Sequence, residues 1–142
     1  MPEIELRVPP RVEYLALVRA VVGAAASLGP GIGDERVDDL RLAVSEATTN
    51  AIEAQRENET DEPISIHCGL TDEHVQIKIR DHGKGFDPDE LVPHPPVTDP
   101  ERLEFERGLG LPLMRTLADE HDISPTPQGT TVRLLIYAAK SD

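Results

Sequence analysis

The feature that most constrains the fold is a pair of alternating apolar segments, 64–70 and 74–80, followed by the hexapeptide Asp-His-Gly-Lys-Gly-Phe. Valine and isoleucine alternate with polar residues in the second segment, which is the two-residue period of a half-buried strand. The polar link Asp72-Glu73 favours a tight turn, so the two segments predict a β-hairpin. The hexapeptide, residues 81–86, therefore sets a carboxylate and two glycines at a strand end, where a ligand has close access to the backbone.

The chain before this hairpin predicts one strand and two helices. Residues 3–8 alternate as a strand does, and apolar residues within 15–25 recur at helical spacing until a Gly-Pro-Gly sequence at 29–31 stops them. Asp34 is the expected N-cap of a second helix, which we expect to end near Gln55.

The chain after the hexapeptide changes character. Residues 87–107 are rich in proline and acidic residues and lack periodicity, and a loop of this length in a compact domain favours a functional lid. Order resumes at Gly108, where a glycine pair precedes a further helix that is expected to run to about Glu120, followed by a closing hairpin around 127–129. The grouping of strands with strands predicts one α+β domain over residues 1–142. We expect a two-layer sandwich, with a mixed, mostly antiparallel sheet covered on one face by helices.

Composition argues against several kinds of partner. The formal net charge is −13, with 27 acidic and 14 basic residues, whereas nucleic-acid binding depends on clustered lysine and arginine. Cys68 is the single cysteine, which excludes an intramolecular disulfide and suits a buried thiol in a reducing cytoplasm. The N-terminus lacks signal-peptide features, and no apolar stretch is long enough to span a membrane. We expect a soluble, cytoplasmic protein that binds neither nucleic acid nor membrane.

Glu46 and Asn50 form the first candidate for chemistry. They lie four residues apart on the second expected helix, so they share one face, and the alanines around them are too small to screen it. A solvated pair on an exposed helix face is the commoner explanation of such residues. However, asparagine has poor helix propensity, and both residues lie beside the buried stripe. An amide oxygen suits Mg²⁺, and a neighbouring glutamate can then act as a base.

Asp81 is the second candidate. Taken alone, it opens an Asp-His-Gly turn, in which Gly83 and Gly85 are ordinary turn glycines. In the functional interpretation, its carboxylate accepts a hydrogen bond from the exocyclic amino group of adenine, which is preferred over guanine. The two glycines then allow the base and ribose to approach the backbone.

Two further glycine segments add weaker signals. Gly108 and Gly110 precede an expected helix and are either a flexible helix start or a source of free N–H groups for an anion. Residues 129–131, Gly-Thr-Thr, are common in hairpins and mean little alone. Only the combination of these segments with Glu46 and Asp81 indicates a nucleotide site.

In this order, the E-x-x-x-N, D-x-G-x-G-F, G-L-G-L and G-T-T motifs resemble the ATP site of the GHKL superfamily, which includes gyrase, heat-shock chaperones, histidine kinases and mismatch-repair ATPases. The sequences LRLAVSEATTNAI and RGLGLPLMRTLADE are similar to those of bacterial anti-sigma factor serine/threonine kinases, over nearly the whole chain. The resemblance implies a Bergerat-type ATP-binding fold with ATP and Mg²⁺ as cofactors. It also implies a homodimer that sequesters a sigma factor and phosphorylates an anti-anti-sigma factor on Ser or Thr.

The resemblance also implies a role for each matching residue. Glu46 corresponds to the general base that deprotonates the acceptor hydroxyl, and Asn50 corresponds to the ligand of Mg²⁺. Asp81 corresponds to the adenine acceptor, with Thr130 beside it, and Arg107 is a candidate for the γ-phosphate. The base pocket and the phosphate contacts of the lid correspond to Gly83, Gly85, Gly108 and Gly110.

One departure from the family pattern lies shortly after Asn50. Relatives often carry a histidine and an aromatic residue there, where this chain has Ala54 and Arg56, at the edge of the phosphate site. Two other functions stay open. The first is an ATP-binding partner-switching module with little or no kinase activity, which the intact Glu46 disfavours. The second is the catalytic domain of a histidine kinase, which ranks last because the chain begins directly with a strand rather than with a dimerisation helix.

Overall fold

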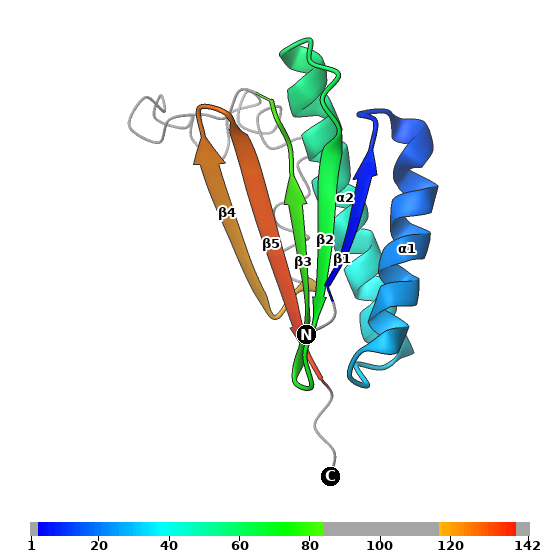
Figure 1. Ribbon diagram of the computed structural model, residues 1–142. Coiled ribbons are helices and arrows are strands. Elements are labelled where there is room, and N and C mark those ends of the chain that lie inside the picture. Colours follow the sequence, from blue (N-terminus) through cyan, green and yellow to red (C-terminus); the bar gives the residue numbers. More distant parts are fainter. Residues whose placement is uncertain (1–2, 84–116, 139–142) are drawn as a thin grey trace, which may run out of the picture.

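A computed structural model describes residues 3–83 and 117–138, which form two layers (Figure 1). The expected lid lies outside the described residues, as do Gly85, Arg107, Gly108 and Gly110 and most of the helix expected after them. In chain order the elements are β1 (Glu3–Val8), the 3-10 turn η1 (Val12–Tyr14), α1 (Leu15–Leu28), α2 (Asp34–Glu57), β2 (Ile64–Leu70), β3 (His74–Arg80), β4 (Glu120–Thr126) and β5 (Gly129–Tyr137).

The five described strands form one sheet in the order β1-β2-β3-β5-β4. Every neighbouring pair of these strands is antiparallel. The expected β2–β3 hairpin is confirmed, with Cys68 opposite Ile77 and Ser65 opposite Arg80. Because the alternating pattern fixes which side chains face inward, this register puts the isoleucines of both strands on the same face. The α+β sandwich expected from the sequence is thus confirmed.

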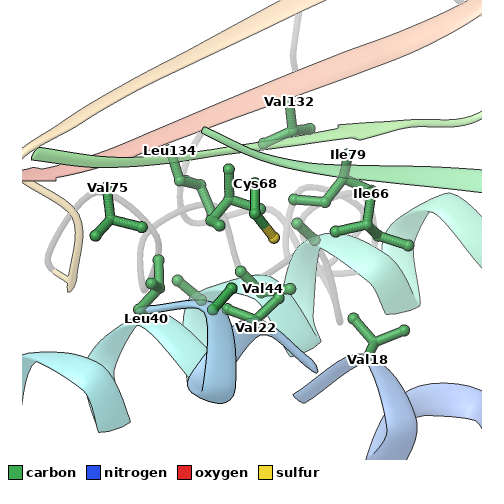
Figure 2. Packing of buried hydrophobic residues seen from close by; sticks show 14 of the residues in the cluster. Val18, Val22, Leu40, Val44, Ile66, Cys68, Val75, Ile79, Val132 and Leu134 are labelled. Atoms are coloured by element: carbon green, nitrogen blue, oxygen red, sulfur yellow. The ribbon is translucent and has the colours of Figure 1, made fainter. Parts of the chain in front are cut away.

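Helices α1 and α2 cover one face of the sheet, and the core lies between the two layers (Figures 1 and 2). Burial raises the pKa of the Cys68 thiol to about 11, as expected for a thiol in apolar surroundings. None of the helices in the described ranges is long and apolar enough to cross a membrane. The largest fully buried apolar side chains are Leu40, Ile52, Ile64, Ile66, Ile77, Ile79, Leu134, Ile136, Val8 and Val18.

Both ends of α2 differ slightly from the expectation. The N-cap is Gly33, with φ of 87°, and Asp34 is the first helical residue, so the assignment of Asp34 as N-cap is wrong by one position. Glycine adopts this positive φ without strain, and Asp34 and Glu35 then place negative charge in the first turn, where the helix dipole favours it. The helix ends at Glu57, two residues beyond the expected end.

The segment that enters β4 is held by the first part of α2. Arg36 donates from Nη1 to the carbonyl oxygen of Leu117 (3.0 Å) and from Nη2 to Oδ1 of Asp119 (2.8 Å). Oδ2 of Asp119 accepts a hydrogen bond from the backbone N–H of Tyr137 (2.8 Å). Helical structure stops at Leu117 and β4 begins at Glu120, so the expectation that the helix runs to Glu120 is wrong at its end. The Gly-containing hairpin between β4 and β5 is confirmed.

Candidate functional site

Asp81 follows the last residue of β3 and is only 6% exposed. Its Oδ1 accepts hydrogen bonds from the backbone N–H groups of Gly83 (3.0 Å) and Thr130 (3.2 Å), and its own N–H donates to the Thr130 carbonyl (3.0 Å). Burial raises the pKa of Asp81, and the two hydrogen bonds to Oδ1 oppose that rise. Both bonds go to Oδ1, so within the described part of the chain Oδ2 has no donor. The residue is a fixed, buried carboxylate with one oxygen left to accept a ligand's donor.

Strand β5 approaches Asp81 closely at Gly129. Gly129 has φ of 149°, and a Cβ at this position would lie 2.1 Å from the Asp81 carbonyl oxygen. A side chain is therefore excluded both by the backbone conformation and by the contact. This glycine keeps the start of β5 near enough for the Thr130 N–H to reach the Asp81 carboxylate.

The opposite side of the Asp81 loop rests on the last turns of α2. A Cβ on Gly83 would lie 2.9 Å from the carbonyl carbon and oxygen of Ala54, so the loop contacts the helix backbone directly. The N–H of His82 donates to Oε1 of Gln55 (2.9 Å), and His82 Nδ1 lies 3.1 Å from the Pro63 carbonyl oxygen. The loop 81–83 is thus held between β5 and α2.

Glu46 and Asn50 share one face of α2 with Ala54, because the three residues are spaced by four. The stripe from Glu46 to Ala54 is about 12 Å long at the α-helical rise. Its Ala54 end touches Gly83, so it leads from the Asp81 loop towards the middle of the helix. Both polar side chains are half-buried, and the side chain of Glu46 makes no hydrogen bond or ion pair with any residue that the structure describes.

The structure therefore brings Asp81, Gly83 and Thr130 together, with Asn50 and Glu46 farther along one helix face. Two residues of this region were not among the predicted site residues, Gln55 and Gly129. The sequence carried a signal for Gln55, because it lies four residues after the buried Ala51, at a position where the apolar face of α2 predicts an apolar side chain. Gly129 lay in the Gly-Thr-Thr segment, whose glycine had no assigned contact.

The oxygen ligands in this region suit a metal ion that binds together with a ligand. Among residues 3–83 and 117–138 there is no group of three or more His, Cys, Asp or Glu side chains arranged to hold a metal ion. Mg²⁺ needs few protein ligands, because waters and substrate phosphates complete its coordination. One amide oxygen at Asn50, beside the carboxylate of Glu46, fits that pattern better than it fits a permanent metal centre.

Sequence comparisons place this arrangement among known proteins. A family model described as a histidine kinase-like ATPase domain matches residues 8–136. The serine-protein kinase RsbW of Bacillus subtilis strain 168 is 34% identical over 138 residues, covering 94% of this chain and 84% of the relative. RsbW of Bacillus licheniformis is 36% identical over 138 residues, covering 92% and 83%. RsbW of Staphylococcus epidermidis is 33% identical over 141 residues, covering 96% and 87%.

A solved structure shares the fold. The crystal structure of the RsbU and RsbW domains of Rv1364c from Mycobacterium tuberculosis matches with a TM-score of 0.67 and 20% sequence identity. The match covers 96% of this chain and 32% of that chain. At this identity the likeness concerns the arrangement of helices and strands alone.

Proposed function

This chain belongs to the family of histidine kinase-like ATPase domains, among the RsbW serine-protein kinases, and on that premise we propose that it is an ATP-dependent protein serine/threonine kinase that controls a sigma factor. It sequesters the sigma factor and phosphorylates an anti-anti-sigma factor on a Ser or Thr hydroxyl. A homodimer in the cytoplasm is the form that the resemblance to these kinases favours.

The observation that carries the proposal is the buried carboxylate of Asp81. Its Oδ1 is committed to two backbone N–H groups, whereas Oδ2 faces no donor among the described residues. The exocyclic amino group of adenine supplies the missing donor, while guanine presents a carbonyl oxygen at the same ring position, which a carboxylate repels. Thr130 lies beside the carboxylate and is a second candidate for contact with the base, directly or through a water.

The face of α2 from Ala54 to Glu46 determines how we expect the triphosphate to lie. With the base at the Asp81 loop, this face of α2 would present first Asn50 and then Glu46 to the phosphates, counted from its Ala54 end. Asn50 would hold Mg²⁺ through its amide oxygen, and bound ATP would supply the phosphoryl group. Glu46, which has no competing partner among the described residues, accepts the proton of the incoming hydroxyl. In this proposal Gly83, Gly85, Gly108 and Gly110 shape the base pocket and the phosphate contacts of the lid, and the guanidinium of Arg107 contacts the γ-phosphate.

Phosphotransfer from radiolabelled ATP tests the proposal. The purified chain is incubated with Mg-ATP and each candidate anti-anti-sigma protein from the same genome, and the acceptor is expected to carry label on Ser or Thr. A wild type that binds Mg-ATP but labels none of these acceptors supports the non-catalytic switch instead. A wild type that does not bind Mg-ATP overturns the assignment of the site.

A further inference from the structure

Gln55 is a fully buried amide that joins three separate segments at one end of the sheet. It is 0% exposed and lies in the last turns of α2. Its Oε1 accepts the His82 N–H (2.9 Å), and its Nε2 donates to the Glu62 carbonyl oxygen (2.5 Å). Its backbone carbonyl accepts the N–H of Thr60 (3.1 Å). The residue thus links the helix to the loop before β2 and to the loop after β3, at the end where α2 and β3 both finish (Figure 1).

From these contacts we infer that Gln55 is a positioning residue for adenine, which sets the direction of the Asp81 carboxylate. The inference rests on the proposed function, in which Asp81 accepts the amino group of the base. The N–H that Gln55 binds belongs to the peptide group between Asp81 and His82. Rotation of that peptide group would move the next N–H along the chain, that of Gly83, which donates to Oδ1 of Asp81 and helps to hold the carboxylate in place.

Among the described residues, the other hydrogen bonds of the loop go to β5, to Pro63 before β2 and within the loop itself. Gly83 meets α2 only by packing on the backbone of Ala54. Gln55 supplies the hydrogen bond from α2 to the loop, through its Oε1 and the His82 N–H. The bond that its Nε2 donates to the Glu62 carbonyl fixes the orientation of the same amide. Both polar ends of the amide are paired, so its burial costs little and its bonds mainly fix orientation.

Affinity for ATP and for inosine triphosphate separates positioning from a purely structural role. Inosine triphosphate lacks the exocyclic amino group, so it does not report on the alignment of Asp81 with that group. In Gln55→Met, which removes both hydrogen bonds at similar side-chain length, Mg-ATP affinity should fall by about tenfold and Mg-ITP affinity by much less. The kcat at saturating ATP should stay near that of the wild type, because the loss is in binding of the base.

Two further variants complete the experiment. Ile52→Val, a change in the buried face of the same helix, controls for loss of stability and should keep the wild-type preference for ATP over ITP. Gln55→Asn keeps the amide but is one methylene too short to reach both partners, so it should reduce the preference as Gln55→Met does. An unchanged preference in whichever Gln55 variant folds overturns the role of Gln55. A wild type without any preference for ATP instead overturns the adenine assignment of Asp81 itself.

Discussion

The middle of the sheet and its Asp81 end are both buried, but their chemistry is opposite. Ile77 and Leu134 are each 0% exposed and belong to one apolar cluster. Figure 2 shows side chains of this cluster, Leu134 among them, packed between the sheet and the two helices. At the other region, Asp81 is 6% exposed and Gln55 is 0% exposed, and both rely on backbone partners from distant segments. Apolar burial stabilises the fold, whereas a buried carboxylate costs stability unless something compensates it. The first region therefore stabilises the fold, and the second is the one that we propose binds the nucleotide.

The largest expected effect is on catalysis at the ligand-binding region. Glu46→Gln keeps the size of the side chain and removes its basicity, so phosphotransfer should fall by about 10²- to 10⁴-fold while Mg-ATP affinity stays close to wild type. Acceptor phosphorylation and calorimetry measure the two quantities. Glu53→Gln, an exposed residue of the same helix, is the matched control. A wild-type rate in Glu46→Gln shows that Glu46 is not the base.

The next effect tests the apolar region in isolation. Ile77→Ala removes buried methylene groups from the centre of β3, so the free energy of unfolding should drop by about 2 to 5 kcal/mol, and Ile77→Val by about 0.5 to 1.5 kcal/mol. Urea denaturation gives both values. Under conditions where each variant is folded, ATP affinity should match the wild type. If Ile77→Val lost as much ATP affinity as a site variant does, the apolar region would also contribute to binding, and the two regions would not differ in function.

A smaller effect, on ATP affinity, distinguishes a residue that binds the metal ion from one that binds the nucleotide. Asn50→Ala should weaken binding of ATP in the presence of Mg²⁺ more than in EDTA, because the amide acts on the nucleotide through the ion. Asn58→Ala, which removes an exposed amide bonded to the Ala54 carbonyl, is the control at the C-cap of the same helix. Equal losses with and without Mg²⁺ exclude a ligand role for Asn50.

The apolar region was largely predictable from the sequence, whereas the contacts of the polar region were not. The alternation within β2 and β3 predicted the strand bounds and the hairpin, because a two-residue period is a local property of the chain. The bond from His82 to Gln55 joins residues 27 apart, and the bond from Thr130 to Asp81 joins residues 49 apart. No local pattern encodes such pairs. The motifs named Asp81 and Thr130, and the family resemblance put them side by side, but the backbone hydrogen bond that joins them appears only in the folded chain.

The smallest effect is on stability and depends on pH. Burial raises the pKa of Asp81, so the folded protein holds a proton at pH values where the unfolded chain has released it. The ionised carboxylate therefore lowers stability at neutral pH, and this cost disappears as the pH falls through the folded-state pKa. Asp81→Asn should raise the free energy of unfolding at pH 7, and its advantage over wild type should shrink on acidification.

Denaturation at several pH values checks this prediction. Asp72→Asn, in the exposed turn between β2 and β3, provides the comparison for a general change in charge. An advantage of Asp81→Asn that grows as the pH falls would mean that the carboxylate stabilises the folded chain, and it would remove the stability cost from the account.

Calorimetry of Mg-ATP binding to wild type and Asp81→Asn tests the central claim most directly, that the buried carboxylate serves the nucleotide. The asparagine can still accept the two backbone hydrogen bonds at its oxygen, but it turns an amide donor towards the adenine amino group in place of an acceptor. Affinity should therefore fall by about 1 to 3 kcal/mol, in a variant that is no less stable than wild type. Unchanged Mg-ATP affinity in a folded Asp81→Asn protein would contradict the account.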